Sequence, residues 1–304
     1  MADLILHHFA GSPFSEKVRL VLGYKQLAWR SVTVPNILPK PDVLALTGGY
    51  RKTPILQIGA DIYCDTALIC EVLERLQPTP TLYPSANAAL ARTLGQWADT
   101  TLFWSAVAYS RAVCAELPAA VFEDRKAMGF DVEWVRPADA TTAYQTYVQR
   151  LADMLQGRSY LLADAPSIAD FCAYHALWLV HGRGEAPPPF PLQSDALDGW
   201  WQCLRAIGHG RSTPCDAAEA IEVAASHEPV AIGNTLVPDT ALHDTHGLPL
   251  GSHVVIAAES FGRETTSGEL IAATRTHYSL RRIDARAGTV HVHFPRIGYV
   301  LKPQ

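Results

Sequence analysis

The stretch Ser12-Pro13-Phe14-Ser15-Glu16-Lys17-Val18-Arg19-Leu20-Val21-Leu22 decides how the first part of the chain folds. Ser12 is a favourable N-cap residue, and Pro13 suits the first position of a helix. Apolar side chains recur at helical spacing through the stretch, and an apolar run at residues 4–6 precedes it, as a strand would. We therefore expect a strand, a turn and a helix that begins at a serine hydroxyl.

The start of this helix has a chemical use, because its backbone N–H groups and its dipole favour an anion such as a thiolate. On this stretch alone, a serine that only caps the helix is the simpler interpretation of Ser12. Residues further along the chain decide whether Ser12 only caps the helix or also binds an anion.

Residues 1–80 predict an α/β domain. After the first helix we expect a strand at 28–34, a short helix at 42–47, a hairpin of strands at 54–58 and 62–64, and a helix that starts at Asp65-Thr66. The order is therefore β-α-β, then α, then ββα. Its first unit favours parallel strands joined by a right-handed crossover.

The rest of the chain divides into an all-helical part, residues 86–225, and a small all-β extension, residues 227–304. Within the helical part, Ser167 followed by Asp170 is a capping-box pattern. The helix that it opens is apolar nearly all round, so we expect it to be buried and central. Beyond residue 228 the helical periodicity stops, and short β-like runs alternate with turns.

Composition excludes several classes of function. The 304 residues carry a formal net charge of −5, which gives no support for a nucleic-acid or membrane-binding surface. The start, Met1-Ala2-Asp3, lacks the basic region of a secretory signal. The six cysteines form no CxxC pair and are expected to be reduced thiols in a cytoplasmic protein. The histidines from His227 onward complete no ligand motif, so no metal site is expected.

Three short motifs should lie together at one edge of the expected sheet: Ser12, Thr53-Pro54 and Asp65-Thr66. With these motifs the sequence resembles the glutathione transferase family. Its opening is similar to that of the tau and omega classes, where a serine or cysteine stands five residues before the basic residue that Lys17 matches. Counting back from Lys17 gives Ser12.

Two further segments carry the resemblance. Residues 52–56 are similar to the family segment that contains a cis-proline, and residues 166–171 are similar to the capping motif of its helical domain. The resemblance covers residues 4–207, and the β-rich extension departs from the family pattern. It implies a thioredoxin-like first domain, a helical second domain and glutathione as co-substrate.

The resemblance also implies how glutathione would be held. Asp65 would accept a hydrogen bond from its α-ammonium, and Thr66 would hold the adjacent α-carboxylate at a helix N-terminus. A cis Thr53-Pro54 bond would turn the backbone of Thr53 toward the cysteinyl residue, so that the ligand adds like a strand. Lys40 or Lys52 would pair with the glycyl carboxylate.

Ser12 would donate its hydroxyl hydrogen to the sulfur. A free thiol has a pKa of about 8.5, and about 1.4 kcal/mol of preferential stabilisation of the thiolate lowers that pKa by one unit. Ser15 is a second hydroxyl in the same turn. His8 could act as a base, although a histidine at a strand end more often only forms a hydrogen bond there.

An apolar electrophile needs an apolar wall. We expect Phe14, Phe103, Trp104 and Val107 to supply it, with Tyr109 as a further candidate; the alternative is that these side chains are ordinary core.

The expected function is therefore that of a serine-type glutathione transferase, a homodimer with a role in detoxification. Two alternatives stay open: a glutathione-dependent thiol transferase or reductase, which would need a cysteine in the place of Ser12, and a non-catalytic binding protein on the same scaffold. The extension could cover a sheet edge, extend the ligand pocket or form an oligomer contact.

Overall fold

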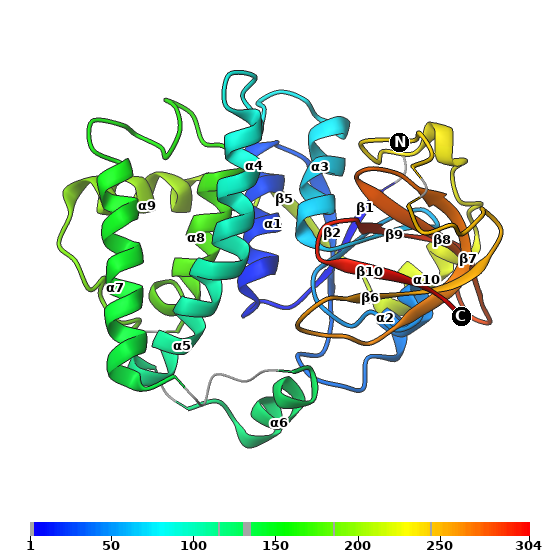
Figure 1. Cartoon of the computed structure of the whole chain (residues 1–304), viewed down its shortest axis with the longest axis horizontal. Coiled ribbons are helices and arrows are strands. Elements are labelled where there is room, and N and C mark those ends of the chain that lie inside the picture. The colour runs from blue at the N-terminus through cyan, green and yellow to red at the C-terminus, as the bar shows by residue number, and fades with distance from the viewer. Residues whose placement is uncertain (1–2, 115, 130–134, 185, 244) are drawn as a thin grey trace.

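Strand β1 (Leu4–His8) lies inside the sheet and is buried along its whole length, with neighbours on both edges. It pairs in parallel with β2 (Ala28–Thr33) and antiparallel with β3 (Ile55–Ile58). The structure is a computed structural model that describes residues 3–114, 116–129, 135–184, 186–243 and 245–304 (Figure 1). Met1 and Ala2, the first residues of the expected N-terminal domain, lie outside the described residues.

The first domain has the expected order of elements. The others in it are α1 (Pro13–Tyr24), α2 (Pro41–Thr47), β4 (Asp61–Cys64) and α3 (Thr66–Leu76). The start of α1 at Pro13, after Ser12, agrees with the prediction from the sequence. Gly48, with φ at +83°, ends α2 in the left-handed region that glycine tolerates.

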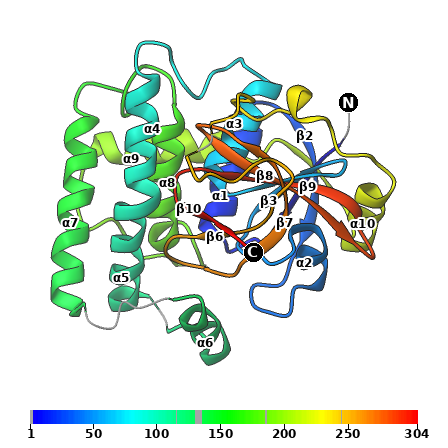
Figure 2. The same ribbon diagram turned by 45° about the vertical axis from the view of Figure 1, so that its right-hand side comes forward.

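Helices from the middle of the chain form the second domain. They are α4 (Ala88–Trp97), the π-helix η1 (Ala98–Leu102), α5 (Phe103–Val113), α6 (Ala119–Ala127), α7 (Pro137–Met154), α8 (Ile168–His181) and α9 (Asp195–Ile207). The capping box at the start of α8 is present, since the Asp170 carboxylate accepts the backbone N–H of Ser167 at 2.9 Å. Helix α8 is central and buried as expected, and Figures 1 and 2 show it between α1 and the outer helices.

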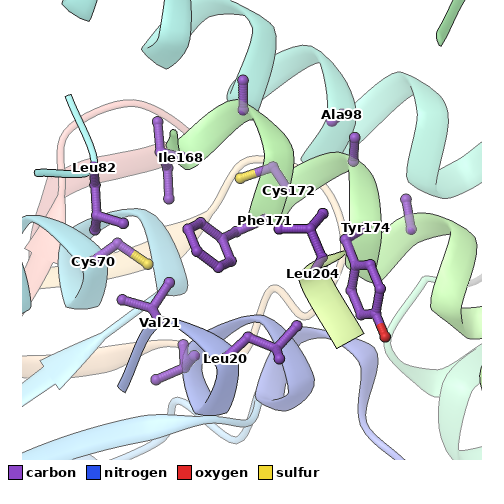
Figure 3. Packing of buried hydrophobic residues seen from close by; sticks show 14 of the residues in the cluster. Leu20, Val21, Cys70, Leu82, Ala98, Ile168, Phe171, Cys172, Tyr174 and Leu204 are labelled. Atoms are coloured by element: carbon purple, nitrogen blue, oxygen red, sulfur yellow. The ribbon is translucent and has the colours of Figure 1, made fainter. Parts of the chain in front are cut away.

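The alternation of side chains along β1 separates two cores. Leu4 and Leu6 face a core shared with the second domain, whereas Ile5 faces a core shared with the extension. Figure 3 shows the first core, in which Phe171 of α8 lies close to Cys70 of α3 and Val21 of α1. The two domains are therefore packed through a common apolar interior.

The C-terminal part of the expected helical domain differs from the prediction. Strand β5 (Arg211–Pro214) pairs in parallel with β2, and α10 (Ala217–Ala225) packs against α2. These residues thus belong to the sheet and its second core. The four residues of β5 are exposed and polar or proline, so they carry no alternating apolar signal.

The extension does not stand apart as a module. Its strands are β6 (His253–Ala258), β7 (Thr266–Ala273), β8 (His277–Asp284), β9 (Gly288–Pro295) and β10 (Tyr299–Pro303), preceded by the short helix η2 (Ile232–Asn234). Strand β9 pairs in parallel with β4, so that one ten-stranded sheet runs in the order β10-β6-β7-β8-β9-β4-β3-β1-β2-β5. The fold class is confirmed, and the extension proves continuous with the first domain.

The extension curves back over the core that it shares with the first domain. A register shift between Leu270 and Ala272 interrupts the pairing of β7 with β8, and such bulges increase strand bending. As a result β10, five positions from β4 in the sheet order, returns to the end of β4. There Tyr299 packs on Phe294, with ring centroids 5.5 Å apart.

A buried hydrogen-bond chain fastens β9 to β4. His293 shares a hydrogen bond of 3.0 Å with Asp61 through Nε2 and one of 2.7 Å with Ser279 through Nδ1. The three residues are at most 1% exposed. Although serine, histidine and aspartate follow one another as in a hydrolase triad, a nucleophile without access to solvent has no substrate. The chain is therefore structural.

Within the described ranges, no group of three or more His, Cys, Asp or Glu side chains could hold a metal ion, and no helix is long and apolar enough to cross a bilayer.

Replacing Asp61 tests how the extension is fastened. Asp61→Ala removes the partner of His293 and also the acceptor of the Val230 N–H, which is 2.9 Å from Oδ2. We expect the free energy of unfolding to fall by about 3 kcal/mol or more in urea denaturation, because two hydrogen bonds to a buried charged group are lost.

The matched control is Asp42→Ala, which breaks another link between the first domain and the extension. The ion pair of Asp42 with Arg286 is largely exposed, so its loss should cost less than about 1 kcal/mol. Equal losses for the two variants would contradict the structural role of the buried chain.

Candidate functional site

Ser12 is the N-cap of α1. Its Oγ accepts the backbone N–H of Ser15 at 3.2 Å, and the residue is 3% exposed. A hydroxyl that accepts one hydrogen bond still has its own hydrogen to donate. Ser15 is fully buried, and its Oγ has no hydrogen-bond partner among the described residues. The sequence thus predicted the local role of Ser12 correctly, and both hydroxyls of this turn lie at the positive end of the helix.

His8 is committed to other contacts. Its Nε2 is 2.8 Å from the hydroxyl of Ser31 and its Nδ1 is 3.0 Å from the guanidinium of Arg19. Burial, together with the charge of Arg19, lowers the pKa of His8 from 6.5 to about 4. With both ring nitrogens hydrogen-bonded, His8 has no free position from which to take a thiol proton.

The peptide bond between Thr53 and Pro54, just before β3, is cis as the resemblance implied. Lys40 lies beside it, and its Nζ donates to the Arg51 carbonyl and to Thr53 Oγ1, both at 3.2 Å. An ammonium has three donors, and the described part of the chain gives Lys40 these two acceptors, so the third donor is available to a ligand. Burial, together with the charge of Arg125, lowers the pKa of Lys40 from 10.5 to about 8.

Asp65 caps α3 in an unusual backbone conformation. Its φ is +73°, a region that costs a non-glycine residue roughly 1–3 kcal/mol and that often marks a functional position. Oδ1 accepts the backbone N–H of Ala67 at 2.9 Å, and Oδ2 accepts the hydroxyl of Tyr299 at 3.0 Å. Thr66, the first residue of α3, is buried beside it.

Lys52 points toward the same end of the site as Asp65. Its Nζ lies 5.3 Å from the ring centroid of Tyr50 and 5.0 Å from that of Tyr299. Burial lowers the pKa of Lys52, and the charge of Asp65 opposes this shift. The two lysines that were candidates for binding the glycyl carboxylate therefore lie in different places. Lys40 lies beside Thr53, whereas Lys52 lies near Asp65.

An aromatic cluster lies where α1 meets the second domain. Phe14 is 4.6 Å from Phe103 and 4.5 Å from His175 between ring centroids, and Phe103 is 5.6 Å from Trp104. Phe14, Phe103 and Trp104 are each only partly buried.

The other two candidates on α5 differ from each other. Val107 is half-buried one turn after Phe103 and Trp104. Tyr109 is buried and stacks on Tyr144 at 4.4 Å, so it belongs to the core of the second domain.

The two domains also meet through a buried ion pair. Lys17 Nζ donates to Asp99 Oδ2 at 2.6 Å, and His175 Nε2 is 2.7 Å from Asp99 Oδ1. Burial lowers the pKa of His175 to about 4, so it is neutral at pH 7. The pKa of Lys17 is raised, because the charge of Asp99 outweighs burial. This pair links α1 to η1, and His175, which contacts Asp99, also belongs to the aromatic cluster.

Described residues of the extension reach the site, and sequence reasoning assigned none of them. Tyr299 contacts Asp65 and Lys52, Phe261 packs edge-to-face on Trp104 at 5.3 Å, and Glu264 forms an ion pair with Arg51. Figure 1 shows the loop between β6 and β7, which carries Phe261 and Glu264, extending from the sheet toward the helical domain. No local pattern signals these contacts, because their partners are distant in sequence.

Comparisons with known proteins agree with this fold. The family model described as "Glutathione S-transferase, N-terminal domain" matches residues 6–81. The crystal structure of a GST-like protein from Pseudomonas syringae is 40% identical, covers 100% of each chain and superposes with a TM-score of 0.82. The whole fold, extension included, therefore has a counterpart in that protein.

Curated relatives match over shorter stretches. Pyrimidodiazepine synthase of Drosophila melanogaster is 34% identical over 85 residues, which are 27% of this chain and 35% of the relative. FtsZ-localized protein A of Caulobacter vibrioides is 26% identical over 187 residues, 60% of this chain and 79% of the relative. The chain thus spans only about a third of the length of the Drosophila protein.

The buried ion pair generates a stability prediction. Asp99→Asn should lower the free energy of unfolding by about 3–5 kcal/mol, because it leaves the fully buried ammonium of Lys17 without a counter-charge. Lys17→Met should cost less, since the Asp99 side chain is 18% exposed and keeps its hydrogen bond to His175. Chemical denaturation of the two variants measures both values. A larger loss for Lys17→Met than for Asp99→Asn would refute this account.

Proposed function

The chain belongs to the glutathione S-transferase family, and from this premise we propose that it is a serine-type glutathione transferase. The observation that carries the proposal is the start of α1. A serine there caps the helix, accepts one hydrogen bond through Oγ and keeps its own hydrogen to donate. A thiolate beside it would be stabilised by that donor and by the N-terminal end of the helix.

Glutathione would be held along the edge at which β3 begins. The cysteinyl backbone would pair with the backbone of Thr53, next to the cis bond to Pro54. The remaining donor of Lys40 would bind the glycyl carboxylate, while Asp65 and Thr66 would bind the γ-glutamyl end. This assignment gives the glycyl role to Lys40 and not to Lys52, because Lys52 lies near Asp65.

The reaction follows from the ionisation of the thiol. Ser12 and the helix N-terminus lower the pKa of the bound thiol, and its proton passes to solvent. The thiolate then attacks the electrophilic carbon and forms a C–S bond, while the bond to the leaving group breaks; with 1-chloro-2,4-dinitrobenzene the group that leaves is chloride. The protein forms no covalent bond in this scheme. Phe14, Phe103, Trp104 and Val107 would contact an apolar electrophile, and Phe261 of the extension adds to the same aromatic surface.

Two other functions remain as alternatives. A thiol transferase that forms a mixed disulfide needs a cysteine at the start of α1, so we expect little exchange activity with β-hydroxyethyl disulfide. A non-catalytic binding protein is favoured by a different observation: one relative, FtsZ-localized protein A, bears a name that states a localisation and not a reaction. Tight glutathione binding without turnover of any electrophile would support that alternative.

Family membership also motivates three proposals that concern the whole protein: a cytoplasmic location, a homodimer and a role in detoxification.

Replacing Ser12 tests the central role. Ser12→Ala should lower kcat with 1-chloro-2,4-dinitrobenzene at least about tenfold and leave the glutathione Kd within about threefold, because one donor to the developing thiolate is lost. The pKa of the bound thiol, followed by thiolate absorbance, should rise toward the value of free glutathione. Calorimetry gives the Kd.

Ser15→Ala is the matched control, since its Oγ is buried without a described partner in the same helical turn. It should leave kcat nearly unchanged. If Ser15→Ala abolished turnover and Ser12→Ala did not, the roles of the two hydroxyls would be reversed.

The lowered pKa of Lys40 predicts a pH dependence of binding. Lys40 is charged below pH 8 and loses its proton above it, so its attraction for a carboxylate is present at low pH and lost as the pH rises. S-methylglutathione, which has no titrating thiol, should bind about five- to tenfold more weakly at pH 9 than at pH 7. Lys40→Arg keeps its charge and should remove most of this decline. An identical decline in both proteins would exclude Lys40 as the titrating group.

A further inference from the structure

Tyr299 of the extension contacts both charged side chains at the Asp65 end of the site. Its hydroxyl donates to Asp65 Oδ2 at 3.0 Å, and its ring centroid lies 5.0 Å from Lys52 Nζ. The residue is 4% exposed. It lies outside the sequence motifs of the first domain. A single side chain thus links a carboxylate and an ammonium that are supplied by another part of the chain.

Neighbouring groups hold this arrangement in place. The ring of Tyr50 lies 6.4 Å from that of Tyr299 and 5.3 Å from Lys52 Nζ, so the ammonium lies over two aromatic faces, each of which attracts a cation. Gly262 packs against the stem of Lys52, since a Cβ at Gly262 would lie 3.0 Å from Lys52 Cδ. The extension therefore restricts both the head and the stem of Lys52.

The opposite charges of Asp65 and Lys52 indicate which chemical group of a ligand would bind here. A carboxylate and an ammonium, held near each other by separate supports, are complementary to the ammonium and carboxylate of an α-amino acid head. Asp65 Oδ1 is used by the backbone of Ala67, so Oδ2, which Tyr299 orients, is the oxygen that would meet the ligand ammonium. An oxygen accepts more than one hydrogen bond, so the contact with Tyr299 does not block it.

We propose that Tyr299 is a positioning residue through which the extension completes the binding site for the α-amino acid head of glutathione. Its hydroxyl orients Asp65 toward the α-ammonium, and its ring, with that of Tyr50, holds Lys52 toward the α-carboxylate. This inference rests on the proposed function. It adds that recognition of the zwitterionic head depends on residues 234 positions apart in the chain.

The experiment compares two ligands by calorimetry: glutathione, and glutaryl-Cys-Gly, which lacks only the α-amino group. Wild-type protein should bind glutathione at least about tenfold more tightly. Tyr299→Phe removes the hydroxyl and keeps the ring, so it should weaken glutathione binding about fivefold and leave glutaryl-Cys-Gly binding within twofold. In an Asp65→Asn background, Tyr299→Phe should cause no further change in this selectivity.

Tyr278→Phe is the control, because it removes another tyrosine hydroxyl from a buried position in the extension and should alter neither affinity. Equal losses for both ligands in Tyr299→Phe would reveal a purely structural role and overturn the inference, as would unchanged or tighter glutathione binding. If the wild-type protein bound no glutathione, the proposed function itself would fall, and the inference with it. The wild-type titration therefore separates the two failures.

Discussion

The pairing of β9 with β4 is the contact on which the rest of this structure depends. Strand β4 would otherwise end the sheet of the first domain with a row of unpaired backbone groups, which a protein must cover or pair. Here residues 291–293 pair with 61–63, and the buried contact of His293 with Asp61 fixes that register. A slip of one residue would turn His293 and its neighbours to the opposite face.

From this attachment the extension gains its position over the site. The strands that follow β9 in the sheet curve around a shared apolar core until β10 meets the end of β4. Asp65, which begins the next helix after β4, is then within reach of Tyr299. The same continuity brings the loop between β6 and β7 to Trp104 of the helical domain. The pairing of the extension with the edge strand β4 therefore brings C-terminal residues into contact with the site of the first domain.

Local features of the sequence predicted a large part of this arrangement. The cap at Ser12, the hairpin after Pro54 and the capping box at Ser167 depend on residues within a few positions of one another, so they are visible in a single sequence. Long-range pairings were not visible. The strand at 211–214 has no apolar alternation, and the hydrogen bond between Tyr299 and Asp65 joins residues that share no motif.

Charge and burial give the site its chemical character. Lys17 is buried with a full counter-charge and is structural, whereas Lys40 is buried against a carbonyl and a hydroxyl and holds its proton less firmly. An ammonium with neutral partners is stabilised when a ligand supplies a carboxylate, so it favours an anionic ligand. This difference, which only the structure reveals, separates the lysine that stabilises the domain interface from the lysine suited to binding.

A crystal structure of the protein soaked with glutathione tests the central claim most directly. The account predicts a tripeptide extended along the start of β3, with its sulfur within hydrogen-bonding distance of Ser12 Oγ and its α-amino acid head between Asp65 and Lys52. Glutathione bound elsewhere, or with its sulfur directed away from the start of α1, would contradict it.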